Sequence, residues 1–117
     1  MDIEAIRTYC LKKPGHITEE TPFGDAVLVF KVQGKMFLLA NLSQFPLTIN
    51  LKSEPSRAIE LRERYDAVRP GYHMNKKHWN TVTLDGSLPA PVVRQMIDES
   101  YAGVVNVLKR SARPRPE

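Results

Sequence analysis

The sequence of 117 residues contains a single cysteine, Cys10, so the chain cannot form an internal disulfide bond. It contains no apolar run near the roughly 18 residues that a transmembrane helix needs. The N-terminal segment, residues 1–4, is acidic and lacks the hydrophobic stretch of a signal peptide. These absences predict a protein of the reducing cytoplasm that does not enter a membrane. Cys10 itself is expected to be a buried, small apolar side chain.

Recognisable catalytic motifs are also missing. The sequence has no Gly-x-Ser-x-Gly elbow, no glycine-rich phosphate loop and no His-Glu-x-x-His motif. His16, His73 and His78 do not have the spacing of a zinc site. We therefore expect no metal, no cofactor and no enzymatic activity. A hydrolase-like alternative would need His78 to pair with Asp66 or Asp85 as base and orienting group, and nothing in the sequence brings them together.

The charge is unevenly distributed along the chain. Residues 1–51 carry five basic and five acidic side chains, whereas residues 52–117 carry twelve basic and eight acidic ones. The whole net charge of +4 therefore lies in the second half. This asymmetry is compatible with an anionic partner, although many unrelated proteins are equally basic.

Apolar spacing predicts three helices. The first covers residues 2–12 with Asp2 as its N-cap, and the second is capped by Ser53 with Pro55 in its first turn. Ser87 opens the last and longest helix, whose broad apolar stripe suits a helix laid across a sheet. Arg62, on the second helix, is expected to face water.

Alternating apolar and polar residues predict five strands. They cover residues 26–33, 36–40, 47–51, 67–69 and 79–84. Gly34-Lys35 is interpreted as a two-residue hairpin turn with glycine in the first central position. Residues 16–24 are polar and are expected to form a loop.

This order predicts an α+β fold with the sequence α-β-β-β-α-β-β-α. An antiparallel sheet of about five strands is backed on one face by the N- and C-terminal helices. Residues 1–110 make a single domain, and residues 111–117 make a flexible tail rich in arginine and proline. We expect a monomer.

The candidate binding segment runs from Arg69 to Asn80. A Pro-Gly turn opens it, and cations, imidazoles, amides and aromatic rings follow. Such side chains in a loop indicate a recognition surface. With Lys52, the candidate nucleic-acid-binding residues are Arg69, Tyr72, His73, Asn75, Lys76, Lys77, His78 and Trp79.

Several segments resemble one family of small bacterial proteins. They are Phe23 to Asp25, Val29 to Val32, Gly34 to Phe37, Leu51-Lys52 with Pro55, Arg69 to Val82, and Leu84 to Pro89. On these segments, nearly the whole chain resembles the MmcQ/YjbR family. The resemblance implies a frataxin-like (CyaY-like) fold and the double-wing DNA binding described for that family.

Structural explanations for the same residues remain open. Strand alternation puts Trp79 on the same side as Thr81, on the open face of the sheet, where it could stack on bases. Because strand ends twist and bulge, the ring could instead plug the end of the core. Gly71 could supply a positive φ that the loop needs. Lys76 and Lys77 could be solvated loop charges.

The leading hypothesis is weak, non-specific binding of DNA through phosphate contacts. The alternative is a protein-interaction or small-ligand-binding domain without a nucleic-acid role. A cationic face containing Lys52, Arg69, Lys76 and Lys77 would favour DNA. A closed apolar pocket beside His73 and His78 would favour a ligand or catalysis.

Overall fold

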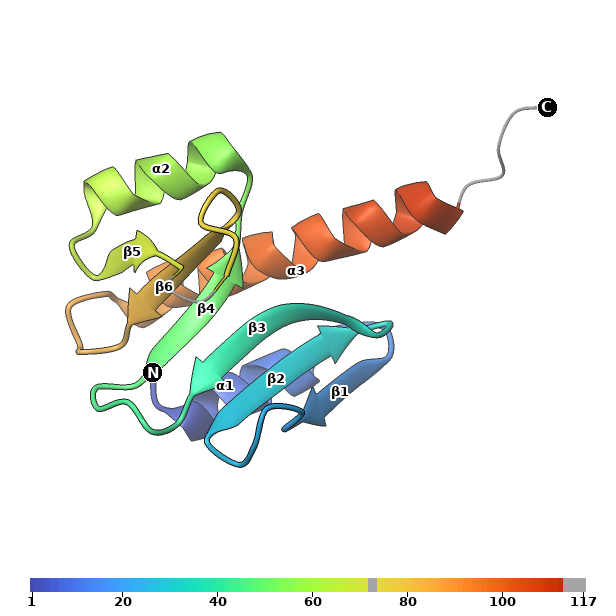
Figure 1. The fold of residues 1–117 in the computed structure, drawn as a ribbon, viewed down its shortest axis with the longest axis horizontal. Coiled ribbons are helices and arrows are strands. Elements are labelled where there is room, and N and C mark those ends of the chain that lie inside the picture. The colour runs from blue at the N-terminus through green and yellow to red at the C-terminus, as the bar shows by residue number, and fades with distance from the viewer. Residues whose placement is uncertain (72–73, 113–117) are drawn as a thin grey trace.

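The structure is a computed structural model that describes residues 1–71 and 74–112. Within them lie three helices, α1 (Ile3–Leu11), α2 (Pro55–Arg64) and α3 (Ala90–Ala112). The strands are β1 (Ile17–Glu20), β2 (Val27–Val32), β3 (Lys35–Asn41), β4 (Thr48–Lys52), β5 (Val68–Pro70) and β6 (Trp79–Thr83). They form one antiparallel sheet in the order β1-β2-β3-β4-β6-β5 (Figure 1). The predicted α+β class and both covering helices are confirmed.

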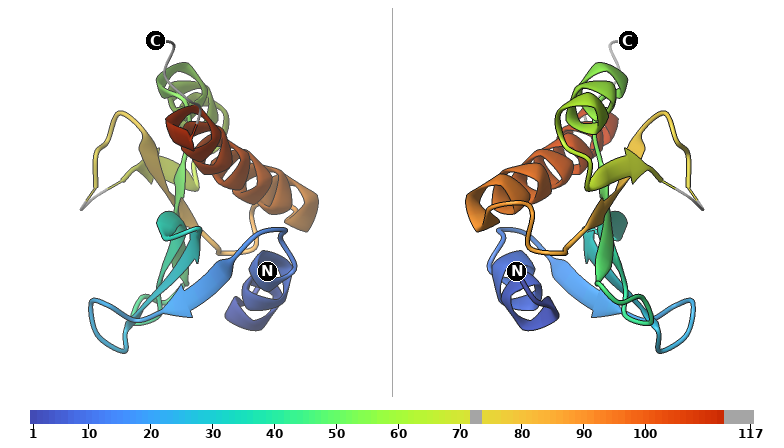
Figure 2. Two further views of the ribbon diagram at one scale, coloured as in Figure 1. Left: turned by 90° about the vertical axis from the view of Figure 1, so that its right-hand side faces the viewer. Right: turned by 90° about the vertical axis from the view of Figure 1, so that its left-hand side faces the viewer.

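One face of the sheet carries the core. Alternation along β4 turns Ile49 and Leu51 to this face, and the paired strand β6 adds Val82. The helix α3 crosses the middle of the sheet, α1 lies beside β1, and α2 covers β5 and β6. Figure 2 shows α1 and α3 on the same side of the sheet. The opposite face, here called the open face, carries none of the helices within residues 1–71 and 74–112.

A sixth strand, β1, was not predicted. Residues 17–20 read Ile-Thr-Glu-Glu, and one apolar residue is too weak a pattern to predict a strand. The strand exists because it pairs with β2 from Ile17↔Val32 to Glu20↔Val29. Long-range pairing has therefore overridden the local polar composition.

The β2–β3 hairpin differs from its prediction in register. Gln33 and Gly34 both have positive φ angles, 49° and 80°, and Val32 pairs with Lys35. Glycine is therefore the second central residue of the turn. A bulge then shifts the register between Phe30 and Lys31.

The bulge changes which β3 side chains reach the core. Phe37 and Leu38 are consecutive in sequence, yet both are fully buried in it. Strict alternation would have turned one of them away. The Phe37 ring packs edge-on against Tyr101 of α3, with ring centroids 5.5 Å apart.

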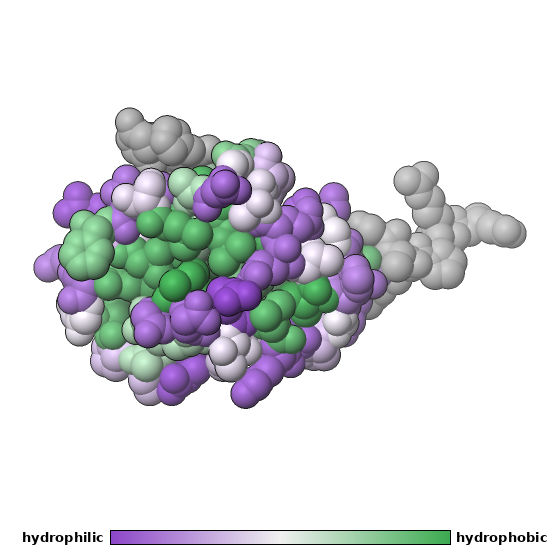
Figure 3. All heavy atoms as spheres, turned by 90° about the horizontal axis from the view of Figure 1, so that it is seen from below, coloured by the Kyte–Doolittle hydropathy of each residue, from purple (hydrophilic) through white to green (hydrophobic). Residues whose placement is uncertain are grey.

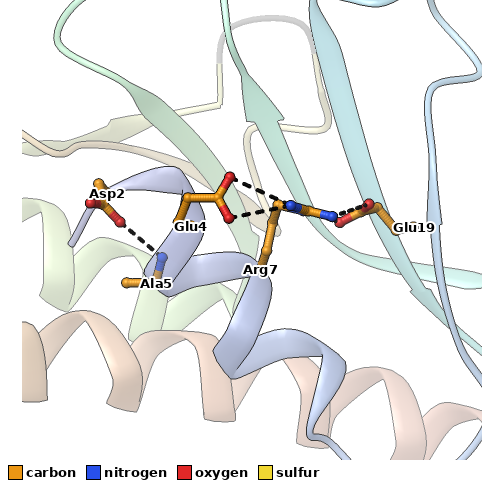
Figure 4. Close-up of polar contacts among 5 residues, drawn as sticks. All are labelled: Asp2, Glu4, Ala5, Arg7 and Glu19. Carbon is orange, nitrogen blue, oxygen red and sulfur yellow. Dashed lines mark hydrogen bonds and ion pairs between the residues drawn. The ribbon is translucent and has the colours of Figure 1, made fainter.

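The start of α1 was predicted correctly. The Asp2 carboxylate accepts a hydrogen bond from the Ala5 amide at 2.8 Å, as an N-cap does. Farther along the helix, the Arg7 guanidinium forms two hydrogen bonds with Glu19 of β1, at 2.6 and 3.0 Å (Figure 4). This ion pair connects α1 to the edge strand.

The two other helix starts were predicted wrongly. Glu54, not Ser53, is the N-cap residue of α2, and its side chain makes no cap hydrogen bond. The helix α3 begins at Ala90, because Ser87 instead donates its amide and hydroxyl hydrogens to the Asp85 carboxylate in a turn. The same helix extends through Ala112, two residues beyond the predicted domain limit.

Ser100 closes a gap between two strands. The β3–β4 ladder stops at the pair Leu38↔Leu51. Beyond it, the buried Ser100 hydroxyl donates to the Phe37 carbonyl at 2.6 Å and accepts from the Lys52 amide at 2.9 Å. One side chain of α3 therefore satisfies a donor and an acceptor of two diverging strands.

We predict that Ser100→Ala lowers the free energy of unfolding by about 1–3 kcal/mol, because it leaves the Lys52 amide and the Phe37 carbonyl without a partner. Urea denaturation measures the change. Ser56→Ala, at an exposed position of α2, is the control. A Ser100→Ala variant as stable as the control would contradict this role.

Cys10 behaves as predicted. Its side chain is fully buried in the core cluster, and burial raises the pKa of the thiol to about 12. At pH 8 the folded protein therefore has almost no thiolate, which is the reactive form.

We predict negligible reaction of Cys10 with a thiol reagent at pH 8 until denaturant is added. Absorbance followed over time measures the reaction. Rapid labelling of the folded protein would contradict the burial.

Candidate nucleic-acid interface

The predicted binding segment forms the connection between β5 and β6. In Figure 1 it lies near the end of β4, next to the start of α2. A hydrogen bond of 2.7 Å from the Ser53 amide to the His78 carbonyl joins it to the β4–α2 connection. Lys52 is paired with Trp79, so the segment and Lys52 are neighbours in space, as predicted. Tyr72 and His73 lie outside the described residues.

An arginine of α2 holds the described part of this loop. Arg62 donates through Nε to the Asn80 side-chain oxygen at 2.6 Å. Its Nη2 donates to the Lys76 carbonyl and, at 3.4 Å, to the Trp79 carbonyl. The prediction that Arg62 faces water was therefore wrong. The apolar spacing of α2 could not show that a loop would fold back over this side chain.

Asn80 connects Arg62 to the core side of the sheet. Its side chain is 1% exposed and lies on the core face of β6. The amide nitrogen donates to the Ala58 carbonyl of α2 at 3.1 Å, while the amide oxygen accepts from Arg62. A buried amide with both ends bonded fixes the spacing of α2 and β6.

Asn75 shapes the turn in front of β6. Its side-chain oxygen accepts from the Lys77 amide at 3.0 Å, and its carbonyl accepts from the His78 and Trp79 amides at 3.1 and 2.9 Å. These bonds set the direction of the two lysines that follow. The Asn75 side chain is itself exposed.

Trp79 is largely buried, with 9% of its surface exposed. It lies on the open face, as alternation predicts, directly opposite Lys52 in the pairing of β4 with β6. The Gly71 amide donates to the Trp79 carbonyl at 2.8 Å, and a Cβ at Gly71 would come within 3.0 Å of the Trp79 Cβ and carbonyl oxygen. Glycine is needed for this close approach, and no positive φ is involved.

The basic side chains gather around this loop. Lys76 and Lys77 are exposed, and within the described residues neither has an acidic group within ion-pair distance. Arg69 is exposed on the open face, where its strand pairs with Thr81 of β6. Residues 52–82 contain seven basic and four acidic side chains, so most of the net charge of +4 lies here.

His78 is half-buried and is one of the residues that line a cleft between α2 and α3. The cleft has a volume of about 560 Å³, and its lining includes Lys52, Arg57, Glu99 and Arg110. These charged groups distinguish it from the closed apolar pocket that would have favoured catalysis. His78 forms no side-chain hydrogen bond with Asp66 or Asp85 in the described part of the chain. Within residues 1–71 and 74–112, no group of three or more His, Cys, Asp or Glu side chains could hold a metal ion.

Comparison with known proteins gives the family. The YjbR family model matches residues 11–102. The chain belongs to the YjbR family. It is 36% identical to uncharacterized protein YjbR of Escherichia coli strain K12, covering 97% of this chain and 95% of that one. It is 37% identical to uncharacterized protein YbdF of Escherichia coli O157:H7, covering 80% and 77%.

Solved structures of similar proteins share the fold of this family member. DR2400 of Deinococcus radiodurans, described by the domain DUF419, has a TM-score of 0.82 at 42% identity and covers 87% of this chain and 77% of its own. A structural-genomics target from Pseudomonas syringae has a TM-score of 0.72 at 27% identity, covering 86% and 96%. These comparisons establish the family and the architecture, and their descriptions state no activity.

No helix within residues 1–71 and 74–112 has the length and apolar character to cross a membrane.

The Arg62 anchor gives a testable expectation. We predict that Arg62→Lys speeds hydrogen exchange at the amides of residues 77–79, because lysine keeps the charge but loses the forked hydrogen bonds to Asn80 and the loop carbonyls. Arg64→Lys, at an exposed site on the same helix, is the control. Equal exchange rates in both variants, measured by NMR, would show that Arg62 does not hold the loop.

Proposed function

We propose that this YjbR-family chain binds DNA through a cationic interface made of Lys52, Arg69, Lys76 and Lys77. The observation that carries the proposal is the pair Lys76 and Lys77, exposed and without acidic partners among the described residues. Arg62 binds the backbone that presents them. Lysines on an anchored loop lose less conformational freedom on binding than lysines on a mobile one.

The chemistry of these groups defines the kind of binding. Lysine and arginine contact phosphate oxygens and carry no sequence information by that contact. With two to four such contacts, affinity is weak, in the range of about 10⁻⁴ to 10⁻⁶ M, and falls steeply with salt because bound counterions are released. The burial of Trp79 leaves little ring surface for a base, so the interface of this proposal is electrostatic.

A protein-interaction role is the second candidate. The loop that joins β3 to β4 exposes Leu42 at 40% and Phe45 fully. Exposed apolar side chains of this size are typical of docking surfaces. In this alternative, the basic loop only keeps the protein soluble.

The double substitution Lys76→Ala with Lys77→Ala tests the DNA proposal. We predict weaker binding of duplex DNA whatever its sequence. The slope of log K against log salt concentration should become less steep by up to about two units. Fluorescence titration at several salt concentrations measures both quantities.

The matched control is Lys12→Ala with Lys35→Ala, which removes the same charge from exposed positions outside the interface. The control should retain most of the wild-type affinity and salt slope. Equal losses in the two double variants would mean that net charge alone attracts DNA. Absence of binding at low salt would favour the protein-interaction candidate.

A further inference from the structure

The open face of the sheet is hollowed into a groove of about 610 Å³. Side chains of β2, β3, β4 and β6 line it, together with residues of the loops on either side. The lining residues are Phe23, Val27, Met36, Leu39, Asn41, Gln44, Thr48, Asn50, Met74 and Thr81. Figure 3 looks at the molecule from below and not straight onto the open face. On that side, apolar surface gathers in the left-hand half, a smaller apolar patch lies right of centre, and hydrophilic side chains surround both.

The lining of the groove combines apolar surface with uncharged hydrogen-bonding groups. Half of its residues are apolar, and the other half are amides and hydroxyls. The Thr81 hydroxyl donates to the Asn50 side-chain oxygen at 2.6 Å, and the Asn50 amide nitrogen has no bond to another described residue. Phe23 stands at the groove with 69% of its surface exposed. This composition suits a ligand part that is flat, uncharged and polar at its edge.

The charges lie next to the groove rather than inside it. Lys52 follows Asn50 by two residues on the same face of β4, and Arg69 is paired with Thr81. Lys76 and Lys77 follow Met74 in the same loop. An anion would therefore be held at this border, while the uncharged part of the same ligand would lie in the groove.

A nucleotide has this division of chemistry. Its phosphate is anionic, and its base is flat, uncharged and hydrogen-bonds only at the edge. In a duplex, base faces are stacked and the Watson–Crick edges are paired, so only an unpaired base can place its ring face against Phe23. We propose that the groove binds an unpaired base of a single-stranded nucleic acid, stacked on Phe23, while the border cations hold its phosphates. This inference rests on the proposed function and makes the preferred substrate single-stranded.

The test compares Phe23→Ala with the wild-type chain on three oligonucleotides of about 12 nucleotides. They are single-stranded DNA, the same strand as RNA, and the DNA duplex. Fluorescence anisotropy at low salt gives the affinities. Phe45→Ala is the matched control, because Phe45 is equally a loop phenylalanine, is fully exposed and does not line the groove.

We expect single strands to bind more tightly than the duplex. Phe23→Ala should weaken single-strand binding by about 5-fold to 150-fold, the range for losing one stacked base, and leave duplex binding unchanged. Phe45→Ala should change neither. The DNA and RNA arms tell which sugar accompanies the base, and dependence on Phe23 in either arm supports the proposal.

A DNA strand with abasic sites separates bases from phosphates. Such a strand keeps every phosphate but lacks bases that could stack. If the groove binds a base, the wild-type protein should bind the abasic strand as weakly as the Phe23→Ala variant binds the intact strand. If Phe23→Ala does not change the affinity for single strands, or if abasic and intact strands bind with equal affinity, the groove proposal is wrong while phosphate binding still stands. No binding of any oligonucleotide at low salt would overturn both proposals. In that case binding of a protein by the groove becomes the remaining reading.

Discussion

Burial of one face of the six-stranded sheet is the constraint on which the rest of this structure depends. The helices α1, α2 and α3 all pack on that face, and none of the described helices covers the other. The open face and the loops at its ends therefore stay accessible for recognition. Hydrophobic burial decides which side chains remain exposed to a binding partner, although it assigns no function to them.

Two buried polar side chains convert this packing into fixed geometry. Ser100 bonds to both β3 and β4 where their ladder ends, and Asn80 bonds to α2 on the core side of β6. Hydrogen bonds have directions that apolar contacts lack, so these residues fix how α2 and α3 sit on the sheet. The position of the Lys76–Lys77 loop follows from the second of them through Arg62.

The candidate interface separates two kinds of chemistry in space. Exposed cations occupy the loop and the edge of the open face, and an uncharged groove occupies its middle. Coulombic attraction to phosphate acts over roughly a Debye length, about 8–10 Å at ordinary ionic strength, and needs no exact fit. Stacking and hydrogen bonding need contact. In the proposed function, the cations would attract a strand at a distance, and the groove would discriminate between paired and unpaired bases.

The sequence by itself determined the order of the elements other than β1, the apolar faces and the burial of Cys10. Each depends on periodicity or capping within a few residues, so α1 with its Asp2 cap and the strand β4 could be predicted closely. Lys52 was grouped with the segment Arg69–Asn80 from the sequence, but their proximity comes from the pairing of Lys52 with Trp79, which joins strands that α2 and β5 separate along the chain.

The tertiary structure alone decided the rest. Strand β1 exists through its pairing with β2, and the β3 bulge admits Phe37 to the core beside Leu38. Arg62 contacts a loop at least 14 residues away, and the groove is built from four strands and their flanking loops. Such features depend on contacts between residues far apart in the chain, and local patterns carry no record of which distant groups will meet.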